Sequence, residues 1–348
     1  MSVWTNWDPL EEVIVGDCYA PGDLDWCIPG EHLAAFNRIL LETKEDLKYL
    51  EVLLTGLQVK VYRPTVFKYT DKIELNKFTV QQPVSPIVPR DQYLVYGATI
   101  YQTYTSMTDR YFDSLSFNDI FQDAFTRGYN WISQPAPHLV NIPEDKSWLN
   151  QGAMIYHKLL RKQLLWHTAT MFKCGDKLIT NTLGPGTQAG LSWMEKNLPP
   201  ATIVRNTNTT MCNWGHIDHG FFMIDDDTVI CVNSAFVPKY LKTKKIYEIH
   251  QLIPEEEIED SEMPLYKLLD PSKGYPQVVS FSSNVLVVDS NNIIFDKNLP
   301  KLFEFMNTIN VKCHVAPMRH RKFWAAGIHC VTLDIRRRGQ KRKIINAI

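Results

Sequence analysis

The sequence predicts one α/β domain assembled from repeated small modules. Short runs of apolar, β-branched and aromatic residues are separated by turn residues, and segments with helical spacing lie between some of them. The same order of two short strands, a helix and a further strand returns along the 348 residues. No stretch between these units has the composition of a flexible linker, so we expect a single domain.

The N-terminal elements follow from apolar spacing. Residues 13–15 form the first predicted strand, which ends at Gly16. From residue 31 to about residue 57, apolar side chains recur mostly at three- and four-residue spacing, which predicts an amphipathic helix with one buried face. A short strand at 59–62 is stopped by Pro64, because proline cannot donate a hydrogen bond to a strand ladder.

The remaining elements continue this order. Strands are predicted at residues 93–96, 99–101, 177–179, 202–204, 221–224, 229–232, 285–288, 293–295 and 311–315. Helices are predicted at about 118–128, 188–198 and 299–309. Turns rich in Asp and Asn at 225–227 and 289–292 predict two hairpins. Residues 63–90, which contain several prolines, and the polar segment 133–148 are expected to be loops.

The composition is that of a soluble globular protein, and the charge balance indicates neither nucleic acid nor a membrane surface as a partner. Hydrophobic residues make up 45% and charged residues 22%, as in soluble globular proteins. The formal net charge of −1 gives no bias toward nucleic acid or a membrane surface. A basic cluster at 336–343 is expected to belong to a solvated C-terminal tail, residues 340–348. No apolar run approaches the roughly 20 residues of a membrane span.

The cysteines indicate neither a disulfide framework nor a zinc site. There are seven, at irregular spacing and without a CxxC pair: Cys18, Cys27, Cys174, Cys212, Cys231, Cys313 and Cys330. The N-terminal segment lacks a basic stretch followed by an apolar run, so no signal peptide is expected. We therefore expect a reducing, cytoplasmic compartment.

Three local clusters carry residues suited to chemistry. They are Pro89–Asp91 and Gly215–Gly220, each just before a predicted strand, and Gly327–Asp334. A cysteine with a distant histidine and carboxylates is a candidate nucleophile system, since the thiolate attacks carbon while the imidazole moves protons. Carboxylates can also hold a planar cation such as guanidinium. Taken singly, a buried thiol or a lone histidine is more often structural.

Two histidine positions favour a structural interpretation. His216 and His219 flank Asp218, which could suggest a metal site. At a strand entry the two imidazoles would point to opposite faces, so no metal is expected. His329 is likewise expected to face away from Cys330 in an extended segment and to serve packing.

Four segments in order carry a family resemblance. Residues 6–16 read NWDPLEEVIVG, residues 89–91 read PRD, residues 216–218 read HID, and residues 327–337 read GIHCVTLDIRR. They resemble the opening, the Arg-Asp motif, the His-x-Asp motif and the nucleophile segment of the amidinotransferase family. The similarity extends from about residue 6 to residue 339, which suggests a domain at 1–339 and a basic tail at 340–348.

The resemblance implies the pentein fold, a five-bladed α/β propeller of ββαβ modules with the active site in its central channel. It implies that Cys330 attacks the guanidino carbon of a donor, expected to be L-arginine. His216 would protonate the leaving amine and later deprotonate the acceptor amine, through a covalent amidino-cysteine in a ping-pong cycle. Asp91 and Asp218 would hold the guanidinium. No cofactor is implied, and a homodimer is an option by analogy.

The first departure from the family pattern is at His167, within Trp166–Ala169. The family has an aspartate at this position, which pairs with the catalytic histidine. A carboxylate there would stabilise the imidazolium of His216, whereas a neutral His167 could accept a hydrogen bond but supplies no negative charge. Either proton transfer is reorganised in this chain or the site is inactive.

The other departures concern the substrate pockets. Phe236 stands where two relatives have an arginine, which binds the donor carboxylate in the glycine enzyme. A buried carboxylate needs a polar partner, so Lys239 or Arg319 would replace that arginine, or one substrate lacks the carboxylate. Three residues suggest a more apolar acceptor pocket or, alternatively, ordinary core packing: Ala325 and Ala326, which replace glycines, and Trp214.

The sequence therefore predicts an amidinotransferase of specialised metabolism that moves an amidino group from a guanidine donor to a primary amine. A hydrolase of the same superfamily, in which water resolves the covalent intermediate, is one alternative. A non-catalytic homologue that binds a guanidine or a partner protein is the other, supported by His167 and Phe236.

Overall fold

The structure is a computed structural model that describes residues 2–140, 160–182, 186–206, 216–249, 284–296 and 299–346. Among these residues the strands form five three-stranded sheets and one two-stranded hairpin. All five sheets follow one plan, in which the middle strand is antiparallel to the first strand and parallel to the third. This repetition confirms the predicted modules.

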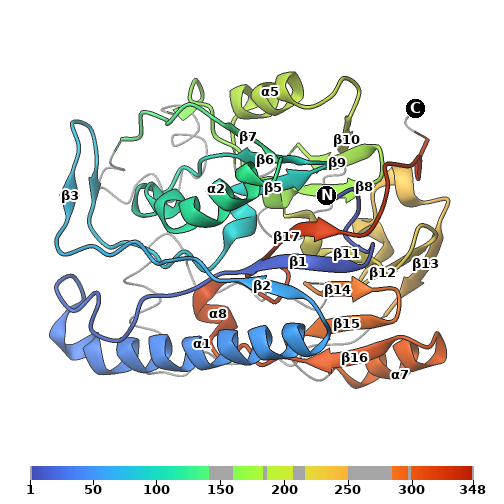
Figure 1. Cartoon of the computed structure of the whole chain (residues 1–348), viewed down its shortest axis with the longest axis horizontal. Coiled ribbons are helices and arrows are strands. Elements are labelled where there is room, and N and C mark those ends of the chain that lie inside the picture. Colours follow the sequence, from blue (N-terminus) through green and yellow to red (C-terminus); the bar gives the residue numbers. More distant parts are fainter. Residues whose placement is uncertain are drawn as a thin grey trace.

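The first module joins the two ends of the fold. Its sheet has the order β17 (Thr332–Arg337), β1 (Leu10–Val15) and β2 (Lys60–Tyr62), and α1 (Gly30–Gly56) connects β1 to β2. Leu10 pairs with Arg337 and Val15 with Thr332, so the last strand supplies the first module with its outer antiparallel partner. Figure 1 shows β1 and β17 side by side, with α1 along the edge of the molecule.

Four further modules complete the fold. The second contains β5 (Tyr93–Tyr96), β6 (Thr99–Gln102), α2 (Asn118–Thr126) and β7 (Asn130–Ser133). The third contains β8 (Met171–Cys174), β9 (Lys177–Asn181), α5 (Gln188–Asn197) and β10 (Ile203–Asn206). The fourth contains β11 (Phe221–Met223), β12 (Thr228–Cys231), the 3-10 turns η7 (Ser234–Phe236) and η8 (Lys239–Leu241), and β13 (Lys245–Glu248). The fifth contains β14 (Leu286–Asp289), β15 (Asn292–Phe295), α7 (Pro300–Thr308) and β16 (Lys312–Val315).

The predicted helices and both hairpins are confirmed, but four strands outside residues 63–90 were missed, namely β7, β8, β13 and β17. β7 and β13 each have only two apolar residues, which lie between polar ends. β17 contains a buried aspartate and two arginines, and β8 includes the buried Lys173, so none of the four forms a continuous apolar run. The region 63–90, expected to be a loop, holds a short hairpin of β3 (Ile73–Glu74) and β4 (Thr79–Val80).

The end of α1 is set by local hydrogen bonds. The N–H of Val59 donates to the Leu54 carbonyl at 3.0 Å, and the N–H of Gln58 donates to the Thr55 carbonyl at 3.0 Å. This is the Schellman pattern, in which the residue after the helix adopts left-handed backbone. Here that residue is Gln58, with φ of +64°. The buried face of α1 is the one that its apolar spacing predicts: Phe36, Ile39, Leu40, Leu47, Leu50 and Leu54.

The basic C-terminal segment is not the solvated tail that the charge pattern suggested. Ile344 and Ile345 are 8% and 2% exposed and belong to the largest hydrophobic cluster. Arg342 bonds to Asp8 and to Asp226, which lies beside β12. Apolar burial and these ion pairs hold residues 342–345 against the body of the fold.

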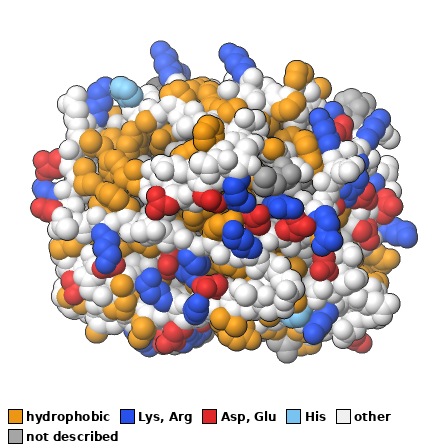
Figure 2. Space-filling view, in the orientation of Figure 1, with side chains coloured by type: hydrophobic (Ala, Val, Ile, Leu, Met, Phe, Trp, Pro, Cys, Tyr) orange, Lys and Arg blue, Asp and Glu red, His pale blue; other side chains and the backbone are white. Residues whose placement is uncertain are grey.

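The face in view in Figure 2 carries charges of both signs. Within the described ranges, none of the helices combines the length and apolar character needed to cross a bilayer. Figure 2 shows acidic and basic side chains interspersed on one face, with hydrophobic side chains gathered in one area. This mixture matches the net charge of −1.

Candidate active site

The modular repeat brings the candidate residues together. In each module a short segment directly precedes the first strand, and each of these segments contributes to one cluster. The contributing side chains are Asp91 in η1 (Pro89–Asp91), His167 before η4 (Thr168–Thr170), Asp218 in η6 (Ile217–His219), Asn284 before β14 and Cys330 before β17. Equivalent positions of five repeated units therefore form a single site.

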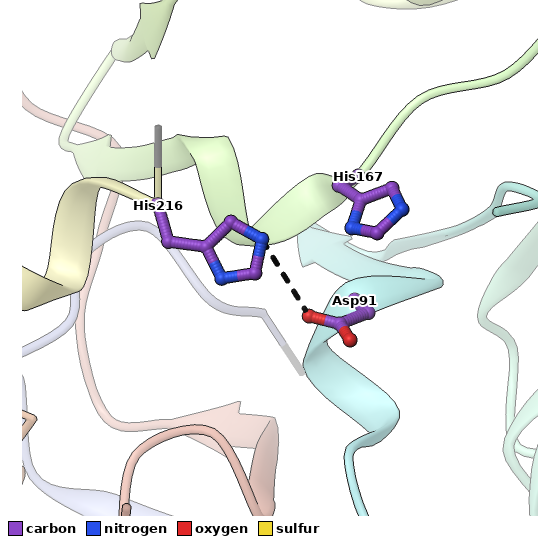
Figure 3. Close-up of side chains that lie close together, drawn as sticks. All are labelled: Asp91, His167 and His216. Atoms are coloured by element: carbon purple, nitrogen blue, oxygen red, sulfur yellow. Dashed lines mark ion pairs between the residues drawn. The ribbon is translucent and has the colours of Figure 1, made fainter. Parts of the chain in front are cut away.

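Asp91 is anchored through one of its two oxygens. Its Oδ2 accepts a hydrogen bond from Arg110 Nη1 at 2.6 Å, while its Oδ1 lies 4.0 Å from His216 Nε2 (Figure 3). Burial acts to raise the pKa of Asp91, but the charge of Arg110, with smaller contributions from His216 and His167, holds it below its usual range. Asp91 is therefore ionised, and Oδ1 is the oxygen that faces the histidines.

His167 lies beside His216, as its sequence position suggested. The centroids of the two rings are 5.7 Å apart (Figure 3). Neither ring nitrogen of His167 has a hydrogen-bond partner among the described residues, so the hydrogen bond that the sequence suggested to His216 is not formed. Burial lowers the pKa of His167 to about 3, against the opposing charge of Asp91. The side chain is therefore a neutral imidazole.

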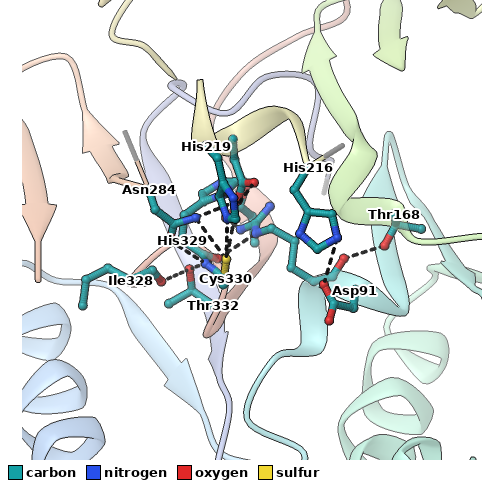
Figure 4. A network of polar contacts seen from close by, with 12 residues as sticks. Asp91, Thr168, His216, His219, Asn284, Ile328, His329, Cys330 and Thr332 are labelled. Atoms are coloured by element: carbon teal, nitrogen blue, oxygen red, sulfur yellow. Dashed lines mark hydrogen bonds and ion pairs between the residues drawn. The ribbon is translucent and has the colours of Figure 1, made fainter. Parts of the chain in front are cut away.

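Cys330 is surrounded by three polar side chains from two other segments, η6 and the segment before β14. Its Sγ lies 3.0 Å from Asn284 Nδ2, 3.7 Å from His219 Nε2 and 3.8 Å from Asp218 Oδ2 (Figure 4). The backbone N–H of Cys330 donates to Asn284 Oδ1 at 3.1 Å. Gly327 permits this approach, because a Cβ at that position would lie 2.6 Å from Asn284 Oδ1.

The environment keeps the thiol protonated in the ligand-free protein. Burial raises the pKa of Cys330 well above its usual range, and the carboxylates of Asp218 and Asp91 raise it further. Hydrogen bonds from the Gly327 backbone and from Asn284 oppose this effect. A cation placed between the sulfur and the two carboxylates would reverse the electrostatic part of the shift.

Asp218 contacts several of the polar side chains around the sulfur. Its Oδ2 accepts a hydrogen bond from Asn284 Nδ2 at 3.0 Å and lies 2.7 Å from His329 Nδ1. Burial acts to raise the pKa of Asp218, but His219 and His329 outweigh it and hold the pKa well below the usual range. The expectation that His329 serves only packing is wrong. Residues 328–331 form a turn, so His329 reaches Asp218 while Cys330 faces the same cluster.

His219 is the imidazole within hydrogen-bonding distance of the sulfur, whereas the sequence analysis considered it only as a possible metal ligand and set that role aside. The expectation that His216 and His219 point to opposite faces is also wrong. Their segment is a 3-10 turn and not a strand, and their ring centroids are 5.6 Å apart. Burial lowers the pKa of His219 to about 4, against the charge of Asp218. His219 is therefore neutral near pH 7 and can accept a proton.

A buried ion cluster holds the turn that carries Cys330. Asp334, which is fully buried, binds Arg90 at 3.1 Å, Lys173 at 2.9 Å and Arg337 at 3.1 Å. Arg90 also donates from Nε to the His329 carbonyl at 2.8 Å. These bonds tie the turn before β17 to η1 and to β8. Arg90 and Asp334 of the recognised motifs are thus structural partners of the site.

The structure describes some, but not all, of the residues predicted to line the substrate pockets. Trp214 lies outside the described residues, and Phe236 is partly buried in η7. Ala326 is fully buried in a hydrophobic cluster, which agrees with the core-packing alternative, and Ala325 has φ of +50°. Arg319 was considered as a carboxylate anchor, but its guanidinium is bound to Asp46, Glu42 and Glu45.

Asn284, His219 and His329 are the site residues that sequence reasoning missed. The modular repeat was a usable signal, since Asn284 directly precedes the predicted strand 285–288 just as Asp91 and Asp218 precede theirs. His219 and His329 required knowledge of the turns in which they lie. Asn and His are common in turns, so their identity alone gave no indication.

Comparison with known proteins extends over the whole chain. No family model matches it. It is 25% identical over 358 residues to inosamine-phosphate amidinotransferase 1 of Streptomyces griseus, covering 97% of each chain. It is also 25% identical over 371 residues to the mitochondrial glycine amidinotransferase of Gallus gallus, covering 97% of this chain and 82% of that one.

Solved structures show the same architecture. The inosamine-phosphate amidinotransferase StrB1 of Streptomyces griseus superimposes with a TM-score of 0.76 at 23% identity, over 98% of both chains. SxtG, an amidinotransferase from Microseira wollei in the saxitoxin biosynthetic pathway, superimposes with a TM-score of 0.72 at 20% identity, over 99% of both chains. These full-length similarities, with the five repeated modules, show that the chain has the pentein fold and that it is similar over nearly its whole length to amidinotransferases.

Proposed function

We propose that this protein transfers an amidino group from a guanidine donor, L-arginine in the simplest case, to a primary amine. Cys330 is the nucleophile, and the reaction passes through a covalent amidino-cysteine in a ping-pong cycle. The observation that carries this proposal is the surroundings of the sulfur, with Asp218 Oδ2 at 3.8 Å and His219 Nε2 at 3.7 Å. The similarity to glycine and inosamine-phosphate amidinotransferases supports an amine as acceptor.

The first half-reaction follows from charge. The guanidinium binds between Asp218 and Asp91, whose Oδ1 faces His216. Its positive charge offsets the two carboxylates that raise the pKa of the Cys330 thiol, so substrate binding itself favours the thiolate. His219 accepts the thiol proton, and sulfur attacks the guanidino carbon. The C–N bond to the donor amine breaks as His216 delivers a proton to that nitrogen.

The second half-reaction reverses these roles. The donor amine leaves and an acceptor amine takes its place opposite the amidino-sulfur carbon. His216 removes a proton from the acceptor as its nitrogen attacks, and the C–S bond breaks to return the thiolate. Atoms balance because the donor gains the hydrogen that the acceptor loses. SxtG acts in toxin biosynthesis, which supports an acceptor from specialised metabolism.

The test is mass spectrometry of the intact protein with and without substrates. Incubation with L-arginine should add one amidino unit to Cys330, and a subsequent amine should remove it and appear amidinated. Cys330→Ser is the matched control and should show no adduct while remaining folded. Loss of the adduct in water alone, with urea formed, would replace the transferase by a hydrolase. No adduct with any member of a guanidine panel would contradict the proposal.

A further inference from the structure

We propose that Asp91, His167 and His216 form a binding site for a divalent transition-metal ion, with Zn²⁺ as the preferred ion. One carboxylate oxygen and one nitrogen from each imidazole lie within 4.8 Å of one another. Figure 3 shows the three side chains gathered around a common space, from η1, from the segment before η4 and from the segment before η6. Two imidazoles and one carboxylate are a ligand set suited to zinc and its neighbours in the first transition series.

The side chain of His167 provides the main evidence for a bound ion. It is 8% exposed, and both of its ring nitrogens are buried without a hydrogen-bond partner among the described residues. Buried polar atoms in proteins almost always have partners, and one that lacks them calls for an explanation. A bound cation would give one of these nitrogens its partner.

Asp91 is prepared for the same role. Arg110 Nη1 holds its Oδ2 at 2.6 Å, whereas its Oδ1 has no hydrogen bond within the described part of the chain. An outer hydrogen bond of this kind fixes the direction of a ligating carboxylate. The charge of Arg110 is itself shared with Asp113 at 2.9 Å, so Asp91 retains negative charge for an ion.

The distances require only a small closure. Asp91 Oδ1 and His216 Nε2 are 4.0 Å apart. Ligands at about 2.0–2.2 Å from a tetrahedral zinc are separated by roughly 3.4 Å. Side-chain rotations can supply the difference, which is about half an ångström for this pair and at most about 1.4 Å for the other pairs, since all ligand atoms lie within 4.8 Å of one another. Three protein ligands leave a fourth position for water, as in zinc sites that are not purely structural.

A second set of residues competes for the same ion. His216, Asp218 and His219 also lie within 4.8 Å of one another and share His216 with the proposed site. Asp218 already binds Asn284 at 3.0 Å and lies 2.7 Å from His329 through the same oxygen, so it has less capacity for a metal. The set that contains His167 is therefore the preferred one.

An ion at this site would occupy His216 Nε2. In that case His216 could not exchange protons with the amines, so micromolar Zn²⁺ should inhibit the transfer reaction. This consequence rests on the proposed function, whereas metal binding itself does not. The binding test is therefore designed without turnover.

The experiment is an optical titration of the chelator-treated, full-length protein with Co²⁺. We expect visible absorption bands of a low-symmetry site that saturate at one ion per chain and disappear on addition of Zn²⁺. His167→Gln should weaken Co²⁺ binding at least about tenfold, as expected when one of three ligands is lost. His138→Asn removes an exposed imidazole and should leave the titration unchanged.

Three outcomes would overturn the site. They are the absence of one-to-one binding, wild-type affinity in His167→Gln, and loss of binding in His219→Gln with retention in His167→Gln. A strong near-ultraviolet charge-transfer band would also overturn it, because it would identify Cys330 as a ligand. X-ray absorption of the Zn²⁺-loaded wild-type protein needs no substitution and should show two imidazoles, oxygen ligands and no sulfur.

Discussion

At the residue scale, burial and two neighbouring carboxylates suppress ionisation of the Cys330 thiol in the ligand-free protein. The thiol is buried, and the carboxylates of Asp218 and Asp91 raise its pKa well above the usual range. Asn284 contacts both its sulfur and its backbone N–H and fixes its position. The Cys330 thiol of the ligand-free protein is therefore expected to react slowly with reagents that attack thiolates.

This suppression predicts a pH dependence of alkylation. Iodoacetamide should modify Cys330 slowly at pH 8, with a rate that rises about tenfold per pH unit, since only the thiolate reacts. Asp218→Asn removes a negative charge and lowers the thiol pKa, so its rate at pH 8 should rise about threefold to tenfold. Peptide mass spectrometry against time measures both rates.

Asp227→Asn is the matched control, because Asp227 is 75% exposed in the turn between β11 and β12. Its alkylation rate should equal that of the wild type. A wild-type rate that already levels off near pH 7 would show that the thiol is ionised in the free protein, and the electrostatic account would be wrong.

The sequence predicted four of the clustered residues by resemblance, namely Cys330, His216, Asp91 and Asp218, and it marked His167 as altered. It could not assign His219 or His329, because their roles depend on turn geometry that places neighbouring side chains on one side. A strand would have placed them on opposite sides. Asn284 needed the equivalence between modules, which becomes evident only when all five are aligned in space.

At the element scale, the helices were predictable from periodicity and some strands were not. α1 buries the face that its apolar spacing indicates. β8 holds Lys173, whose burial is possible only because Asp334 lies 2.9 Å away on β17, and no local pattern reveals a partner 161 positions distant. A strand whose buried polar side chains bond to segments far away in the sequence cannot be predicted from its local apolar pattern.

The end of α1 offers a test of backbone strain. Gln58 occupies the left-handed position of a Schellman motif, where a side chain costs about 1–2 kcal/mol. Gln58→Gly should raise the free energy of unfolding by about 0.5–1 kcal/mol, after the greater flexibility of glycine in the unfolded chain is subtracted. Urea denaturation measures the change. Gln58→Ala, which retains Cβ, should show no such gain, and equal stability of the two variants would contradict the interpretation.

At the scale of the whole molecule, the C-terminal segment belongs to the fold. The charge pattern at 336–343 suggested a tail separate from the domain at 1–339, because basic runs are usually solvated. Ile344 and Ile345 instead pack into the hydrophobic cluster that contains strands of the fourth and fifth modules. Two apolar residues after a basic run are too short a pattern to predict docking.

The docked segment should contribute measurably to stability. Ile345→Ala should lower the free energy of unfolding by about 2–5 kcal/mol, since it removes a buried side chain and leaves a cavity. Lys343→Ala, at an exposed position two residues earlier, should change it by less than about 0.5 kcal/mol. Urea titration of both variants measures these changes. An Ile345→Ala variant with the same free energy of unfolding as the wild type would mean that this segment is not docked in solution.

The pairing of Leu10 with Arg337 also sets the order in which the molecule can mature. A ribosome releases Asp91, His167 and Asp218 well before position 330. A nascent chain whose middle modules have folded therefore lacks the Cys330 thiol. The last strand then closes the circle over the longest sequence separation in the fold, which is the slowest kind of contact to form. Closure of the first module and placement of Cys330 beside Asn284 and Asp218 therefore occur in a single late event.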